Sequence, residues 1–170
     1  MFALKMFKKI INLLQSDISP DQIAWGFALG AILGLVPGIF MKSLLFIIIM
    51  IFRVNLSSAF LAAALFAIIG FAIDPLLDKI GYVVLVNFDF LNSFYTWLYN
   101  LPIVPFTKFN NTVVMGSLIT GIILIIPNGI IAKKMLVYYR QNYKDKVANL
   151  KIIKFIDAIM GVTTVINKTK

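Results

Sequence analysis

The segment Ser19 to Gly38, SPDQIAWGFALGAILGLVPG, decides how the rest of the chain is interpreted. It opens with helix-start signals: Ser19 can cap, Pro20 suits the first helical position, and Gln22 completes a capping box. Glycines then recur every four residues, so they lie on one helical face and form a groove without side chains. In lipid, such a groove lets a second helix approach backbone to backbone. The glycines are Gly26, Gly30, Gly34 and Gly38.

The composition supports a membrane protein. The chain has 170 residues, of which 61% are hydrophobic, whereas soluble domains are about 45–50% apolar. In a soluble helix, each interior glycine would cost roughly 0.5–1 kcal/mol relative to alanine. We therefore predict a small, all-α, polytopic membrane protein. The glycine row is interpreted as an internal packing surface, with a substrate path or a partner-binding groove as the alternatives.

Several classes of chemistry are disfavoured by missing residue types. The chain contains no cysteine, histidine or glutamate. Disulfides, thiol nucleophiles, imidazole bases and the commonest metal ligands are therefore absent from the sequence. We expect no enzymatic activity, no metal and no cofactor.

Charge and hydropathy divide the chain into three expected parts. Residues 1–18 are predicted to form an amphipathic helix at the membrane interface, with lysines opposite an apolar face. Residues 19–132 form the membrane domain. Residues 133–170 form a basic cytoplasmic tail that includes an amphipathic stretch at 152–160.

The membrane domain itself is predicted to contain a hairpin and two long spans. Residues 19–54 form a glycine-rich hairpin broken at Pro37-Gly38, which is either re-entrant or a pair of tight spans. Residues 55–73 and 112–132 are long uncharged runs that suit full spans. Between them, residues 74–111 form an external loop rich in aromatic residues, which favour the headgroup level.

Basic residues set the expected orientation. The first fifteen residues carry three lysines, and the segment from Lys133 onward carries nine lysines or arginines. The 74–111 loop has only Lys79 and Lys108, against three aspartates. The positive-inside rule therefore predicts that both termini are cytoplasmic. The basic tail is expected to contact anionic lipid headgroups rather than nucleic acid.

Two acids between the predicted spans are candidate functional residues. Asp74 and Asp78 are four residues apart and can share a helical face. Paired carboxylates could serve proton coupling, a cation or phosphoryl chemistry. Alternatively, Asp74 caps a new helix that begins at Pro75, and Asp78 favours its first turn or pairs with Lys79.

A second polar cluster precedes the last span. It could bind an anionic headgroup at a helix N-terminus, or it could only cap the helix. Two adjacent asparagines and a threonine exceed what a cap requires, so both interpretations stay open. The cluster consists of Lys108, Asn110, Asn111 and Thr112.

Two motifs resemble a known bacterial family. The first is SPDQIA at 19–24 with Gly30, Gly34 and Pro37, and the second is PFTKFNNTVVMGS at 105–117. Together they resemble the integral-membrane family of domain of unknown function 2062, in particular a subgroup of short members that carry the second motif. Many members of the wider family have Asn-Pro where this chain has Asp74-Pro75. The resemblance implies a bacterial inner-membrane location and no catalytic activity.

The functional prediction follows from these points. We expect a non-enzymatic component of the inner membrane that supports a partner, in envelope or lipid traffic, and that contacts a protein partner or a second copy of the chain. The alternative is a small transporter or lipid translocator with its site near Asp74, Asp78 and the asparagine pair, since transporters place sites at broken helices.

Overall fold

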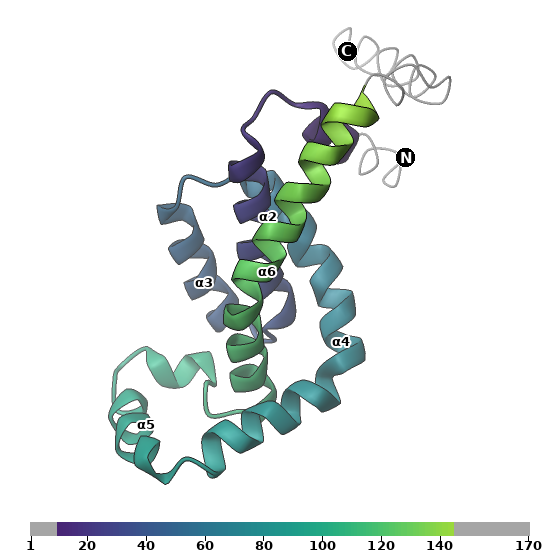
Figure 1. Ribbon diagram of the computed structural model, residues 1–170. Helices are drawn as coiled ribbons and strands as arrows, with labels where there is room; N and C mark the ends of the chain where they lie inside the picture. The colour runs from purple at the N-terminus through teal and green to yellow at the C-terminus, as the bar shows by residue number, and fades with distance from the viewer. Residues whose placement is uncertain (1–9, 145–170) are drawn as a thin grey trace, which may run out of the picture. The chain divides into compact units, whose positions relative to one another are not determined.

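The computed structural model describes residues 10–144, and all regular structure within that range is helical (Figure 1). The predicted all-α class is confirmed. The chain divides into two compact units: Ser19–Lys133, and a second unit made of Met1–Ile18 and Lys134–Lys170. Most of the amphipathic N-terminal helix, the 152–160 stretch and most of the basic tail lie outside the described residues.

The first helix of the larger unit begins where the sequence predicts. Helix α2 spans Pro20–Leu35, and the Ser19 hydroxyl accepts a hydrogen bond from the Gln22 amide at 3.3 Å. The chain then breaks at Pro37-Gly38, where Gly38 has φ +88°, a conformation that favours glycine. Helix α3, Ile39–Ile51, follows. Whether this pair is re-entrant or crosses the membrane twice stays a prediction.

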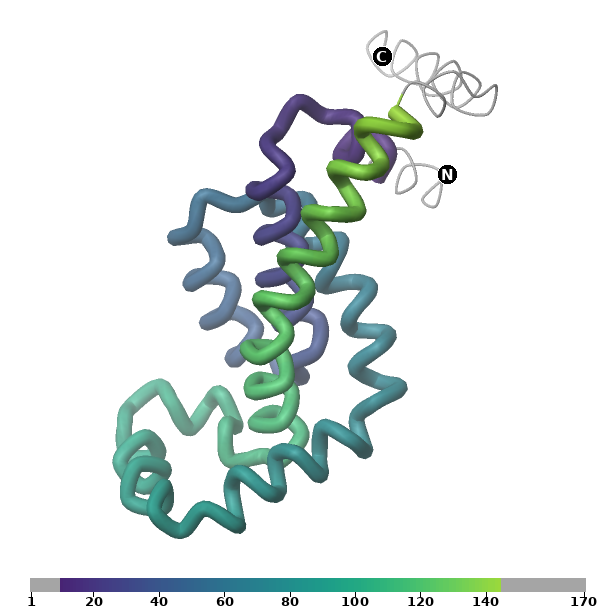
Figure 2. The backbone as a smooth tube through the Cα atoms, in the orientation of Figure 1, coloured from purple at the N-terminus to yellow at the C-terminus, as the bar shows by residue number. Residues whose placement is uncertain are grey.

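Helix α4 corrects the expected end of the next element. It spans Leu56–Val86 without interruption, so Asp74 and Pro75 lie in its interior. The prediction that Asp74 caps a new helix is therefore wrong. Proline removes the one hydrogen bond to the carbonyl four residues earlier, at Phe71, and this local loss bends a long helix more readily than it ends it. Figures 1 and 2 show α4 changing direction in its lower half.

A connector of short helices follows α4. It contains η1 (Asp89–Leu91), α5 (Asn92–Tyr99) and η2 (Val104–Thr107). The aromatic-rich stretch that was expected to be one interfacial segment is thus divided among the end of α4, η1 and α5. Helix α6, Thr112–Asn142, then begins at a cap, because the Asn111 side chain accepts a hydrogen bond from the Val114 amide at 3.1 Å.

Helices α4 and α6 are the two elements that could cross a membrane. Each has 31 residues and is apolar enough to do so by length and composition, within the described part of the chain. In α4 only 22% of the most apolar window is buried inside the protein. Its remaining apolar surface is available to lipid or to a partner.

The glycine row of α2 lies against α4. A Cβ atom added at Gly26, Gly30 or Gly34 would come within 2.1–2.5 Å of a backbone carbonyl oxygen of Asn55, Ala59 or Ala63, respectively. Residue numbers rise together along both helices, so α2 and α4 run parallel. Gly38 does not belong to this row, because a Cβ atom there would meet nothing within 4 Å. Its role is the helix break.

Hydrogen bonds join the starts of the same two helices. The buried Ser58 hydroxyl donates to the Ile23 carbonyl at 2.7 Å, and the Asn55 amide donates to the Gln22 carbonyl at 2.9 Å. The Asn55 side chain caps α4 by accepting from the Ser58 amide at 2.8 Å. The close backbone approach is thus anchored at its first turn by polar groups that satisfy one another.

The opposite side of α2 is covered by α6. Gly121 of α6 lies against Ile32, and Gly129 lies against the ring of Trp25. At the same end as Trp25, Lys133 pairs with Asp21 at 2.7 Å. Helix α6 therefore runs antiparallel to α2, which has close neighbours on two sides and is the central helix of this unit.

The smaller unit is described over residues 10–18 and 134–144. Residues 10–15 are helical. Arg140 donates hydrogen bonds from Nε to the Leu14 carbonyl at 3.1 Å and from Nη1 to the Ile18 carbonyl at 2.8 Å. Lys144 lies 3.6 Å from Asp17.

Candidate functional site

A polar contact joins α4 to α6 at the connector end of the larger unit. The Thr112 hydroxyl donates a hydrogen bond to the Asp78 carboxylate. Beside it the backbones cross closely, because a Cβ atom at Gly81 would overlap the Thr112 carbonyl and one at Gly116 would overlap that of Leu77. Asp78 and Thr112, which are both predicted site residues, thus lie together at a helix crossing.

Asp74 lies one turn before Asp78 in α4 but has a different environment. It is half-buried, and no hydrogen bond or ion pair reaches its carboxylate within residues 10–144. It directly precedes Pro75, where the helix lacks one backbone hydrogen bond. An unpaired carboxylate beside a weakened point of a long apolar helix is the feature that would suit proton or cation coupling.

The Lys108–Thr112 cluster forms a tight turn before α6. Lys108 adopts φ 55°, ψ 35°, the left-handed conformation that is uncommon for residues other than glycine. Its carbonyl accepts from the Asn111 amide at 2.9 Å, and its amide donates to the Pro105 carbonyl at 3.1 Å. The turn directs neighbouring side chains into two different hollows.

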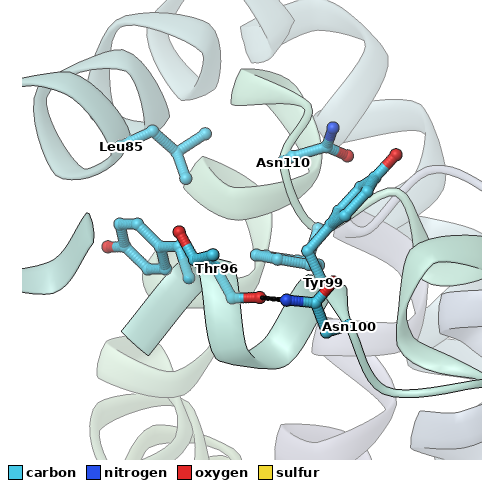
Figure 3. A pocket seen from close by; sticks show the side chains of 7 residues that line it. Leu85, Thr96, Tyr99, Asn100 and Asn110 are labelled. Carbon is cyan, nitrogen blue, oxygen red and sulfur yellow. Dashed lines mark hydrogen bonds between the residues drawn. The ribbon is translucent and has the colours of Figure 1, made fainter. Parts of the chain in front are cut away.

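The first hollow has about 370 Å³ and lies between the end of α4, α5 and the connector (Figure 3). Its lining carries no charged side chain, and three of its residues are aromatic. In Figure 3, Leu85 and Asn110 border it on one side and Thr96, Tyr99 and Asn100 on the other. We call it the aromatic hollow; it is lined by Leu85, Tyr95, Thr96, Tyr99, Asn100, Phe109 and Asn110.

Much of the polar chemistry of the aromatic hollow is used internally. The Tyr95 hydroxyl donates to the Val84 carbonyl at 3.1 Å, and burial raises the pKa of this phenol above its ordinary value of 10.0. The Asn100 side-chain amide donates from Nδ2 to the Thr96 carbonyl at 2.9 Å. The Asn110 side chain, which borders the hollow, has no such bond within the described residues.

The second hollow, also about 370 Å³, lies between the start of α3 and the turn before α6. Lys108 and Asn111 supply its polar edge, opposite the Pro37-Gly38 break, and Phe40 and Phe106 supply its apolar edge with ring centroids 5.8 Å apart. The six predicted site residues therefore do not form one site. Asp78 and Thr112 form a helix contact, Asp74 stands apart, and the cluster is divided between two hollows.

Two features of this region were missed from the sequence. One is the Gly81–Gly116 crossing, because nothing local connects glycines in different helices. The other is the aromatic hollow, although the high density of Tyr, Phe and Trp between residues 82 and 109 was a visible signal. Within residues 10–144, no three His, Cys, Asp or Glu side chains gather to hold a metal ion.

Comparison with known proteins identifies relatives. Residues 4–144 match the profile of the family described as an uncharacterized protein conserved in bacteria, DUF2062. An uncharacterized protein of Treponema pallidum (strain Nichols) is 28% identical over 140 residues, which cover 82% of this chain and 86% of that protein. No solved structure matches.

Proposed function

The chain belongs to the DUF2062 family of bacterial proteins, and we propose that it is a non-enzymatic component of the bacterial inner membrane that supports a protein partner. Its termini are cytoplasmic, and the partner acts in envelope or lipid traffic. The observation that carries this proposal is the contrast between a tightly interlocked interior and a large apolar surface.

Close backbone contacts join the helices of the interior. Three glycines of α2 touch the backbone of α4, and Gly81 and Gly116 do the same between α4 and α6. Translocation by rocking or gating requires helices that separate, whereas these crossings are closed by backbone contact. An interlocked helical body favours a supporting role over a moving one.

The surface supplies the contact area for a partner. Helix α3 buries only Met41 and Ile49, and much of its remaining apolar surface is exposed, including Ile39, Ile47 and Ile51. Exposed apolar residues on a membrane helix contact either lipid or another protein. With only 13 residues, α3 is shorter than the roughly 20 that a full span needs, so a partner helix beside it would complete its environment.

Site-specific photocrosslinking in native membranes tests this proposal. A photoreactive amino acid is introduced in turn at Ile39, Ile47 and Ile51, with Ile49 as the matched control, because Ile47 is 60% exposed and Ile49 only 3%. We expect a discrete protein adduct from at least one exposed position and none from Ile49. Lipid adducts alone at all three exposed positions would contradict the proposal.

A small transporter or lipid translocator is the second candidate, and Asp74 is the observation that favours it. The carboxylate is half-buried and has no partner in the described chain, next to the proline of α4. If Asp74 couples transport, Asp74→Asn abolishes it while the protein still accumulates.

Under the lead proposal, Asp74→Asn has little effect. Asparagine matches aspartate in shape, and no hydrogen bond is lost. We expect normal protein level in membranes and an unchanged crosslinking pattern. Flux of fluorescent lipid in reconstituted vesicles, present in the wild type and lost in Asp74→Asn, would instead establish the translocator.

A further inference from the structure

The smaller unit holds an unusual concentration of unsatisfied donors. Four side-chain nitrogen or oxygen atoms in residues 10–144 are buried without a hydrogen-bond partner, and three of them belong to this unit: Gln15 Nε2, Tyr139 Oη and Arg140 Nη2. Buried polar groups are normally paired, and a buried charged donor is the costliest to leave unpaired. Each of the three atoms can donate, so what is missing is an acceptor.

Two of the three residues are sequence neighbours on α6, and the third lies in the segment that Arg140 contacts. Leu136, Tyr139 and Arg140 follow the spacing of one helical stripe, and Leu136 is buried. Arg140 donates to the carbonyls of Leu14 and Ile18, so its guanidinium lies against the segment that contains Gln15. These two bonds use Nε and Nη1, so Nη2 is the guanidinium nitrogen that has no partner among the described residues.

The charge in this unit favours an anion. Among the described residues of this unit the acid is Asp17, which is fully exposed and pairs with Lys144 rather than with Arg140. A guanidinium binds phosphate oxygens through charge-assisted hydrogen bonds, to which a phenol and a primary amide can each add one. An anionic phosphate group would satisfy the arginine and both neutral donors together.

The place of Arg140 in the chain indicates where such a phosphate comes from. The last uncharged residue of the α6 span is Ala132, and eight further helical residues advance the chain by about 12 Å. The headgroup regions together add roughly 10–15 Å to a hydrocarbon core of about 30 Å. Half of that addition, about 5–7 Å, lies on each side, so Arg140 is just beyond the headgroup level and within the Debye length over which a basic residue attracts anionic lipids.

We propose that Arg140, Tyr139 and Gln15 form a binding site for the phosphate of an anionic lipid headgroup. The proposal rests on the proposed membrane location, but not on the proposed protein partner. It differs from a general attraction of basic residues to the membrane, because it assigns binding to three buried donors rather than to exposed lysines.

The test uses the full chain purified in a nonionic detergent, with thermal unfolding followed by circular dichroism. The probes are short-chain phosphatidylglycerol, short-chain phosphatidylcholine and inorganic phosphate. For the wild type we expect a saturable rise in the unfolding midpoint with phosphatidylglycerol and a much smaller one with phosphatidylcholine. A midpoint that responds to no probe would overturn the proposal.

The decisive variants are a matched tyrosine pair. Tyr139→Phe removes one buried hydroxyl and leaves both Arg140 hydrogen bonds, while Tyr138→Phe removes a hydroxyl from a neighbouring side chain that is 60% exposed. Loss of one hydrogen bond to a charged group should weaken apparent affinity about 10-fold for Tyr139→Phe. Tyr138→Phe should bind like the wild type, and equal behaviour of the two variants would overturn the proposal.

A second pair separates the buried site from general electrostatics. Arg140→Gln and Lys134→Gln each remove one positive charge, but Lys134 is exposed. Saturable binding should disappear in Arg140→Gln and fall no more than about 5-fold in Lys134→Gln. Equal losses would mean that the tail binds only by net charge. If inorganic phosphate alone reproduces the Tyr139-dependent response, the phosphate site stands and its ligand is a free anion.

Discussion

Glycines occupy three different kinds of position in this protein. Gly30 has no room for a side chain, because the Ala59 carbonyl oxygen would lie 2.1 Å from a Cβ atom there. Gly38 is favoured at its position because the chain turns there with φ +88°. Gly70 meets neither condition, since a Cβ atom would be 3.4 Å from the Leu35 Cα, an ordinary contact. One residue type thus marks a backbone crossing, a turn and a position where alanine would fit.

This difference predicts opposite effects of the same substitution. Gly30→Ala should destabilise the protein by about 1–3 kcal/mol, because α2 and α4 must separate to admit the methyl group. Gly70→Ala should be neutral or stabilising by up to about 1 kcal/mol, since alanine is the better helix former. Thermal unfolding of both variants in detergent measures the difference. Equal midpoints would show that α2 and α4 do not approach through Gly30.

For single residues, contacts between positions close in sequence could be predicted, and contacts between distant positions could not. The caps at Ser19 and Asn111 could be predicted, because each side chain accepts a hydrogen bond from an amide three residues away. The pairing of Asp78 with Thr112 was not, because it joins residues in different helices across a fold that the sequence does not specify locally. Asp78 and Thr112 were each predicted as candidate site residues for a different reason, namely their charge and polarity at predicted helix ends.

At the scale of elements, two prolines behave differently for a physical reason. Pro37 precedes Gly38, whose positive φ cannot continue a helix, and the chain breaks there. Pro75 stands between residues that are compatible with a helix, and packing on both sides holds α4 together. The presence of Pro75 alone was therefore not a sufficient reason to predict that α4 ends at Asp74. The backbone conformation of the residue that follows each proline decided the outcome.

The hydrogen bond from Tyr95 of α5 to Val84 of α4 gives a prediction about the pH dependence of stability. Tyr95 donates its hydroxyl proton to the Val84 carbonyl, and burial raises the pKa of this phenol. An ionised Tyr95 in the folded state is disfavoured, so the unfolded chain loses its proton first as pH rises. Tyr95 therefore contributes stability below pH 10, which is lost as pH rises through the folded pKa.

Tyr95→Phe should lower stability by about 0.5–1.5 kcal/mol at neutral pH, because the half-buried Val84 carbonyl loses its donor. It should also reduce the fall in stability above pH 10. The control is Tyr99→Phe, in the same helix and 52% exposed. Chemical unfolding at pH 8 and at pH 10.5 gives both quantities. An identical pH dependence in Tyr95→Phe and the wild type would contradict the assigned role.

At the scale of the whole molecule, the fold class was easier to predict than which helices pack against each other. Hydropathy and glycine spacing were enough to predict an all-α fold with two long apolar helices, since both depend on composition and local periodicity. The central position of α2, with α4 on its glycine face and α6 on the side of Trp25 and Ile32, depends on contacts between distant residues. The same limit applied to the two hollows, which exist only once α3, α5 and the connector are in place.

The helix directions within the larger unit support one membrane orientation. Helices α2 and α4 run parallel and α6 antiparallel, and Asp21 pairs with Lys133 at the end opposite the Gly81–Thr112 crossing. The connector at 87–111 thus lies at the opposite end of this unit from the Asp21–Lys133 pair. Because the excess of basic residues begins at Lys133, the positive-inside rule predicts that the connector is external.

Cysteine labelling tests this orientation in a chain that has no cysteine of its own. Ser93→Cys, in α5, should react with a membrane-impermeant maleimide in cells whose outer membrane alone is permeable. Thr169→Cys should react only after the inner membrane is opened, because a cytoplasmic thiol is shielded from the reagent. The cysteine-free chain is the background control. Labelling of Ser93→Cys only from the cytoplasmic side would invert the topology and place the aromatic hollow inside the cell.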